Sequence, residues 1–235
     1  MIYVNYYYGF DESYIIYMII SLAVAFFANF QVKHAFKKYS KIHSKSGISG
    51  SQCAEILLKH WGIDYVFVNR TGGEFSDFFD PRSNGVFLSE TVFSPATIAA
   101  VSVAAHECGH ARQHDVGYFP IRIRELLIPV TRIGSSLSMP LVIIGLMLPT
   151  QFDFCLTLGI IFFSLSVLFE VVTLPVEFNA SRRALKALCE TNVLTDDEIK
   201  GAKSVLRAAA LTYVAATFNS LLYLARLIFL ARKKD

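Results

Sequence analysis

The chain has 235 residues, of which 54% are hydrophobic and 14% aromatic, a composition too apolar for an ordinary soluble domain. The formal net charge is only +3, and the basic residues cluster beside apolar runs, which argues against nucleic-acid binding and favours a role in membrane orientation. The four cysteines form no C-x-x-C pair, so they fit a reducing compartment better than a disulfide framework.

The first predicted element is an N-terminal transmembrane helix within residues 1–32. Residues 14–30 form an apolar run long enough to cross a bilayer, and four lysines follow it between residues 33 and 41. A signal peptide would carry its positive charges before the apolar run, so we expect a span that stays in the protein. The positive-inside rule then places the N-terminus outside and the residues from 33 onward in the cytoplasm.

Residues 33–125 are predicted to form a compact cytoplasmic domain. A capping box at 49–52 opens a helix that Gly62 can end, and residues 64–69 are typical of a strand. Residues 77–88 are typical of a β-hairpin, whose aspartates we expect in turn and cap positions rather than as metal ligands. This hairpin is either an ordinary sheet edge or a strand that can pair with an extended peptide substrate, and the sequence leaves both open.

The next predicted helix carries the motif His106-Glu107-Cys108-Gly109-His110. Ser94-Pro95 is typical of a helix start, with serine as the N-cap. Histidines four residues apart lie on one face of a helix and can hold one metal ion, and Glu107 beside them can take a proton from a metal-bound water. The sequence therefore predicts a metal site with His106 and His110 as ligands. Cys108 is expected to be a small buried side chain.

Two histidines leave a catalytic zinc site one protein ligand short. His114 does not complete it, because eight residues of helix separate His114 from His106 by about 12 Å. The metzincin extension is absent too, since Gln113 and Val116 stand where that motif needs glycine and histidine. The third ligand must therefore come from another part of the chain.

Residues 126–176 are predicted to form a transmembrane helical hairpin, with Arg122 and Arg124 before it on the cytoplasmic side. Its two apolar arms, at about 133–148 and 154–176, are separated by a short polar break that begins with proline. The first arm is rich in serine and glycine, which suits close helix packing. The second arm returns the chain to the side of the metal motif.

Residues 177–207 are predicted to form cytoplasmic helices that supply the third ligand. Glu177 follows Pro175, which can start a helix, and the topology puts it on the same side as the motif. Glu170 is the competing candidate, two turns deeper in the membrane, where an acidic residue is usually functional or paired. The alternative for Glu177 is an ion pair with a neighbouring arginine. We prefer Glu177 as the ligand.

Residues 208–235 are predicted to form a membrane-associated or transmembrane helix. The apolar part is long enough to span, but it contains Asn219 and Arg226, and a span would leave the basic residues at 232–234 outside. We favour a tilted or re-entrant packed helix. The predicted fold class is therefore a mostly α-helical integral membrane protein, with transmembrane helices plus a small α+β zincin-like cytoplasmic catalytic domain.

The histidine motif, the membrane hairpin and the segment Glu177-Phe178-Asn179-Ala180-Ser181 together resemble the gluzincin arrangement of HtpX-type heat-shock proteases and CAAX prenyl proteases. The chain is still more similar to the YugP-type neutral zinc metallopeptidases of bacterial membranes. The matching segments include Asp80-Pro81-Arg82, Leu88-Ser89-Glu90, 104–107, 109–111, 173–184 and 208–216. This resemblance implies zinc bound by His106, His110 and Glu177, with Glu107 as the general base.

The chain departs from these families at two positions. Ser181 stands where the better-known proteases carry an aspartate that supports a ligand histidine, and a serine can hydrogen-bond there but supplies no charge. Phe78 stands where the hairpin of this family is expected to carry a histidine, so we assign it no substrate role.

These features predict a membrane-bound zinc metalloprotease, a gluzincin-like endopeptidase of the bacterial plasma membrane with its catalytic site on the cytoplasmic side. The expected cofactor is Zn²⁺, the expected substrate a peptide or membrane protein in the lipid bilayer, and no nucleic-acid partner is expected. Two alternatives are a zinc-binding membrane scaffold without turnover and a zinc hydrolase of a non-peptide substrate. Glu107 argues against the scaffold, because metal binding alone does not need that carboxylate.

Overall fold

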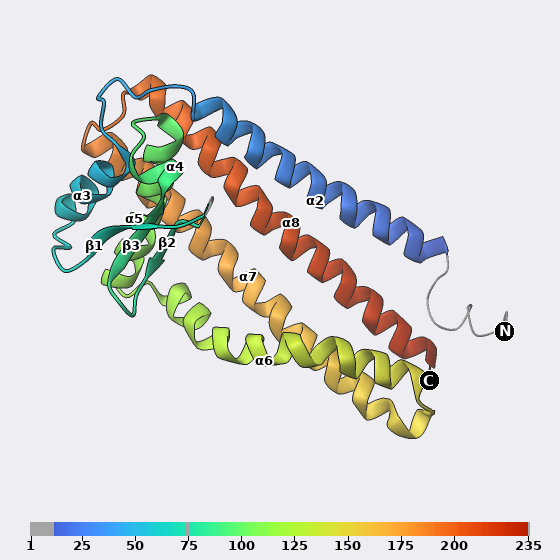
Figure 1. Cartoon of the computed structure of the whole chain (residues 1–235). Helices are drawn as coiled ribbons and strands as arrows, with labels where there is room; N and C mark the ends of the chain where they lie inside the picture. The colour runs from blue at the N-terminus through green and yellow to red at the C-terminus, as the bar shows by residue number, and fades with distance from the viewer. Residues whose placement is uncertain (1–11, 74–75, 235) are drawn as a thin grey trace. The chain divides into compact units, whose positions relative to one another are not determined.

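The computed structural model describes residues 12–73 and 76–234, so the predicted external N-terminus lies outside the described residues. The described part of the chain is mostly helical with one small sheet, which confirms the mostly α-helical character expected from the sequence (Figure 1). The elements in chain order are α2 (Glu12–Tyr39), α3 (Gly50–His60), β1 (Phe67–Thr71), β2 (Phe78–Asp80), β3 (Gly85–Ser89), α4 (Glu90–Phe93), α5 (Ile98–Asp115), α6 (Phe119–Met147), the 3₁₀ helix η1 (Thr150–Phe152), α7 (Asp153–Glu190) and α8 (Asp196–Lys234).

The chain divides into two compact units. The helical unit comprises the chain up to Ala28, Ile123–Leu174 and the chain from Thr212 onward. The mixed unit comprises Asn29–Arg122 and Pro175–Leu211, and it contains the sheet, α3, α4 and α5. The two long helices α7 and α8 each contribute one part to either unit.

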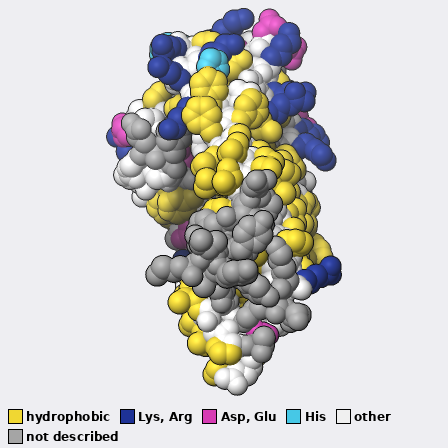
Figure 2. All heavy atoms as spheres, turned by 90° about the vertical axis from the view of Figure 1, so that its right-hand side faces the viewer, with side chains coloured by type: hydrophobic (Ala, Val, Ile, Leu, Met, Phe, Trp, Pro, Cys, Tyr) yellow, Lys and Arg dark blue, Asp and Glu magenta, His cyan; other side chains and the backbone are white. Residues whose placement is uncertain are grey.

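Four helices of the described chain are long and apolar enough to cross a membrane: α2, α6, α7 and α8. In the helical unit they expose large apolar side chains, with Phe26, Leu126 and Phe154 between 64% and 74% exposed. Figure 2 shows such hydrophobic side chains gathered over one described face. Exposed apolar surface of this extent is what a lipid environment stabilises and water does not.

The predicted hairpin of α6 and α7 is held by close helix contacts. A β-carbon at Gly145 would clash with the backbone nitrogen of Leu156, and one at Gly159 would lie 2.8 Å from the side chain of Val142. The Ser138 hydroxyl donates to the Gly159 carbonyl at 3.0 Å. The small residues of these helices therefore serve the close packing that their composition predicts.

The structure corrects two points about the long helices. α7 does not restart at Pro175 but runs through it without a break. A proline within a helix is tolerated where neighbouring elements hold the segment. Of the tilted or re-entrant forms expected for the last helix, the re-entrant form is wrong, because α8 is one helix from Asp196 to Lys234 and the described residues after Gly201 include no glycine or proline. The tilted form stays a prediction. The polar side chains of α8 have partners: Asn219 donates to the Ser21 carbonyl and Arg226 lies 4.1 Å from the ring centroid of Tyr14.

The three-stranded sheet of the mixed unit has the order β1-β3-β2. β2 and β3 form the antiparallel hairpin that the sequence predicts, and β1 pairs with β3 in parallel. β1 begins at Phe67, later than the predicted start at 64, because the chain is still turning after α3. The sheet contacts α5 (Figure 1), so the hairpin lies beside the helix that carries the histidine motif.

The core of the mixed unit forms where α3 packs on α5. Cys53, Ala54 and Leu57 of α3 and Ala104 and Cys108 of α5 are fully buried. The two cysteines are free, and Cys108 lies against the Ala54 carbonyl, as expected of a small buried side chain. These small residues let the two helices approach closely, which fixes α5 in position.

Helix caps set where α3 and α5 begin. Ser49 and Gln52 form the predicted capping box of α3, and Gly62 takes a positive φ of 69° just beyond its end. The predicted Ser94 cap of α5 is wrong. Thr97 caps that helix by accepting from the Ala100 N–H at 3.2 Å, while the Ser94 hydroxyl bonds the Glu90 carboxylate.

Candidate metal centre

The two histidines of the motif lie on one face of α5, as their spacing predicts. Their ring centroids are 4.8 Å apart and the rings are nearly perpendicular, at 84°. His110 is 8% exposed, so the site is largely shielded from water. Both Nε2 atoms face α7 in this arrangement, since each of them lies near the same carboxylate oxygen of that helix.

That carboxylate belongs to Glu177, which is 2% exposed. Its Oε2 atom lies 3.2 Å from His106 Nε2 and 3.5 Å from His110 Nε2. The ligand atoms of these three residues all fall within 4.8 Å of one another, and they form a possible metal site among the described residues.

The separations suit zinc. Tetrahedral ligands that each lie about 2.0–2.1 Å from one zinc ion are about 3.3 Å apart. The two nitrogen–oxygen separations of 3.2 and 3.5 Å bracket that value. Two imidazoles and one carboxylate are also the donor set of many catalytic zinc sites, which keep a fourth position for water. The residues present therefore fit the ion.

Each histidine is oriented through its other ring nitrogen. His110 Nδ1 lies 3.0 Å from Gln113 Oε1, and the Gln113 amide nitrogen donates to the Val176 carbonyl at 2.7 Å. Ser181 Oγ lies 3.2 Å from His106 Nδ1. With an Nδ1–H donated to these oxygens, the Nε2 lone pairs are free to bind a metal. Ser181 thus contacts the histidine from the position of the usual aspartate.

Gln113 also connects α5 to hydrogen-bonded polar side chains on α7. Its amide nitrogen donates to Asn179 Oδ1 at 3.0 Å, and Arg183 Nε donates to the same oxygen at 2.7 Å. The Arg183 guanidinium lies 5.9 Å from the ring centroid of Tyr118. These hydrogen bonds hold the end of α5 against the segment of α7 that carries Glu177.

α5 and α7 meet most closely at Gly109. A β-carbon there would lie 2.6 Å from the Ala180 carbonyl oxygen, closer than side chains pack. Gly109 lies next to His110, and Ala180 lies one helical turn from Glu177. The glycine therefore allows the approach that brings the three ligand atoms together.

Glu107 is 9% exposed, and its surroundings change its pKa. Burial raises the pKa of Glu107 to about 7, with His106 opposing the rise and the charges of Glu177 and Asp77 adding to it. The Phe79 N–H of strand β2 favours the charged form. A carboxyl group whose pKa lies near neutrality can both accept and return a proton.

The hairpin aspartates do not join the metal ligands. Asp77 accepts from the Ser89 N–H at 2.7 Å and from its hydroxyl, and burial raises the pKa of Asp77. Asp80 accepts from the Arg82 N–H at 3.0 Å in the turn between the strands. Asp80 therefore has the turn role that the sequence predicts, whereas Asp77 bonds Ser89 at the end of β3.

The other candidate ligands, His114 and Glu170, have other partners. The His114 and Phe79 ring centroids lie 6.0 Å apart, with the rings tilted by 58°. Glu170 belongs to the helical unit, where it accepts from the Ser220 hydroxyl at 3.0 Å. Gln113 and Asn179 were not predicted from the sequence as residues that support the metal ligands. The signal for Gln113 was available, because a residue three positions after His110 lies on the same helix face.

Residues 14–232 match the family described as "Putative neutral zinc metallopeptidase", and the chain belongs to this family. It is 41% identical over 212 residues to the "Putative membrane protease YugP" of Bacillus subtilis (strain 168), a match that covers 90% of this chain and 93% of that protein. No solved structure matches the chain.

Proposed function

We propose that the protein is a membrane-bound zinc metallopeptidase whose metal is held by His106, His110 and Glu177. The observation that carries the proposal is the convergence of both Nε2 atoms on Glu177 Oε2, at 3.2 and 3.5 Å, within a buried site. Membership of a zinc metallopeptidase family and the similarity to a protein named as a membrane protease support it.

Zinc bound at this site would polarise a scissile carbonyl and acidify a bound water. Glu107 would take the proton of that water and later deliver it to the leaving amine, as a general base and then a general acid. In metal-free protein burial raises the pKa of Glu107 to about 7, so its carboxyl group can hold or release a proton near neutral pH. Gln113 and Ser181 would hold the histidine rings in place throughout the reaction.

The sheet edge offers a place for an extended substrate. β2 pairs only with β3 among the described strands, so its other side is not occupied by a strand of this sheet. β2 also contacts α5, and its Phe79 N–H interacts with Glu107. A peptide that adds to β2 by main-chain hydrogen bonds would pass the general base. This arrangement favours the substrate-pairing role over an ordinary sheet edge.

The proposed location is the bacterial plasma membrane, with the catalytic site on the cytoplasmic side. The basic residues that flank the candidate spans support it: Lys37 and Lys38 end α2, and Arg122 and Arg124 open α6. Lysine and arginine are enriched in cytoplasmic segments beside membrane spans. Under this topology α8 is the fourth span.

The test compares wild type with Glu107→Gln in detergent, with fluorescently labelled casein as a general unfolded substrate. Glu107→Gln should keep its zinc and lose about 10²–10⁴-fold in cleavage rate, because only proton transfer is removed. Glu55→Gln, an exposed change on α3, serves as the matched control and should cleave normally. Zinc-loaded wild type that cleaves no peptide bond would favour the scaffold or a non-peptide hydrolase.

A further inference from the structure

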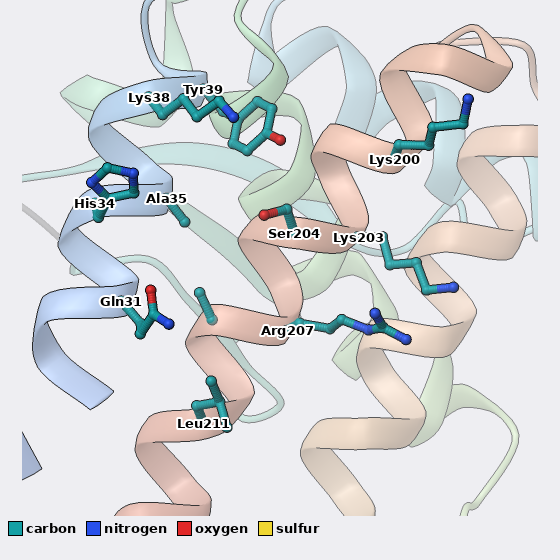
Figure 3. Close-up of a pocket in the computed structure, with 11 residues that line it drawn as sticks. Gln31, His34, Ala35, Lys38, Tyr39, Lys200, Lys203, Ser204, Arg207 and Leu211 are labelled. Atoms are coloured by element: carbon teal, nitrogen blue, oxygen red, sulfur yellow. The ribbon is translucent and has the colours of Figure 1, made fainter. Parts of the chain in front are cut away.

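A second feature of the mixed unit lies between α2 and α8, on residues that the proposed catalysis does not use. A groove of about 480 Å³ is lined by α2 residues near its C-terminal end and by α8 residues near its N-terminal end. Figure 3 shows Gln31 and Lys38 of α2 on the side toward α8, and Ser204 of α8 pointing back toward α2.

The lining is strongly basic. Lys38, Lys200, Lys203 and Arg207 contribute positive charge, and none of the described lining residues is acidic. Lys200 is partly neutralised by Asp197 at 2.9 Å, and Lys38 lies 5.2 Å from the ring centroid of Tyr39. Lys203 and Arg207 have no acidic partner among the described residues, so they are available to an anionic ligand.

Small residues form the base of the groove. Ala35 and Ala208 are 6% and 7% exposed and leave open space between the two helices. Near the Lys200 end the helices close together, because a β-carbon at Gly201 would lie 2.8 Å from the Tyr39 ring. The hydroxyl group of Ser204 and the amide of Gln31 add uncharged donors beside the cations. A compact ligand with several acceptor oxygens fits this set.

The residues around the groove indicate where such an anionic ligand comes from. Phe30 on α2 and Leu211 on α8 are 55% and 39% exposed at the end of the groove away from Lys200. Both helices continue beyond these residues as candidate membrane spans. The groove therefore lies where exposed apolar side chains give way to exposed basic ones, as expected at the headgroup level of a bilayer.

We propose that this groove binds the phosphate headgroup of an anionic phospholipid. Lys203 and Arg207 pair with the headgroup, with Lys38 and Ser204 as further donors, and the acyl chains leave past Phe30 and Leu211. Basic grooves between membrane helices on the cytoplasmic side recognise anionic headgroups through the same chemistry. The site is separate from the metal ligands, so it does not depend on the proposed peptidase activity.

The test measures lipid binding to the full chain in detergent by native mass spectrometry, with added phosphatidylglycerol or phosphatidylcholine. Wild type should retain phosphatidylglycerol preferentially. Lys203→Gln with Arg207→Gln should weaken that binding about 30-fold, since each basic side chain near an anionic headgroup contributes about a fivefold factor. The charge-matched control Lys59→Gln with Lys186→Gln, on exposed residues outside the groove, should leave it unchanged.

A variant that keeps both positive charges distinguishes loss of charge from misfolding as the cause of weaker binding. Lys203→Arg with Arg207→Lys should restore most of the binding, and all variants should keep the zinc content of wild type. Equal retention of the two lipids by wild type would overturn the proposal. Equal loss in the groove and control variants would show a general effect of surface charge and would overturn it too. Displacement of the lipid by inorganic phosphate alone would assign the groove to a soluble anion instead.

Discussion

Replacing Gly109 by alanine tests whether the close approach of α5 and α7 builds the metal site. The added β-carbon would lie 2.6 Å from the Ala180 carbonyl oxygen, 0.8 Å short of the 3.4 Å at which ordinary contacts begin. The obstacle is backbone, so it cannot rotate away, and the helices must separate. Overpacking of this kind costs about 1–3 kcal/mol, and the higher helix propensity of alanine returns about 1 kcal/mol.

The effect on the metal site should exceed the effect on stability. Metal–ligand distances tolerate errors of only about 0.2 Å. A separation of α5 from α7 by several tenths of an ångström moves Glu177 away from His106 and His110, which now lie 3.2 and 3.5 Å from its Oε2. We therefore expect Gly109→Ala to lose at least about tenfold in zinc affinity, with a net destabilisation on the order of 1 kcal/mol.

The assay is chelator competition for zinc, combined with thermal unfolding of the purified protein with and without zinc. Gly134→Ala is the matched control, because the nearest atom to its new β-carbon would be an ordinary 3.5 Å away. The control should bind zinc like wild type and unfold at the same or a higher temperature. Wild-type zinc affinity in Gly109→Ala would refute the reasoning, since the helix approach would then not set the ligand geometry.

Three further predictions follow from the same site. Gln113→Ala should lower zinc affinity about 10–100-fold, and more than Ser181→Ala, because Gln113 contacts His110 and also bonds the Val176 carbonyl of α7; chelator competition measures both, and the reverse order would contradict it. Glu170→Gln should keep full zinc, since Glu170 bonds Ser220 instead; zinc loss would reopen it as the ligand. Burial raises the pKa of Glu107 to about 7, so native metal-free protein binds more protons than unfolded protein between about pH 4.5 and pH 7, and its stability falls as pH rises through that window. Glu107→Gln should remove this pH-dependent part of the stability, which thermal unfolding at about pH 5 and about pH 8 measures. If wild type and Glu107→Gln showed the same difference in stability between the two pH values, the reasoning would be wrong.

Much of the fold and site follows from short-range sequence signals. The histidine motif needs only the periodicity of a helix, and the capping box of Ser49 and Gln52 is a local hydrogen-bond pattern. The hairpin of β2 and β3 follows from turn residues between two apolar stretches. Glu177 was selected by membrane topology together with a family resemblance, and the structure brings it to both histidines.

The features that the sequence did not predict depend on tertiary contacts. The parallel pairing of β1 with β3 joins segments with no local signal for that partner. Ser94 has the right residue type for a cap, but its hydroxyl bonds Glu90, so Thr97 caps α5 instead. Pro175 predicts a helix start, yet α7 continues through it. Gln113 gains its supporting role only when Val176 of α7 packs beside it.

The central claim is that His106, His110 and Glu177 hold one zinc ion, and the metal content of purified protein tests it most directly. Elemental mass spectrometry of wild type, Glu177→Ala and Glu107→Gln needs no known substrate. The structure predicts near-stoichiometric zinc in wild type and Glu107→Gln, with a strong loss in Glu177→Ala, because removing one of three protein ligands opens the site. Full zinc in Glu177→Ala, or no zinc in any of the three, would contradict the account.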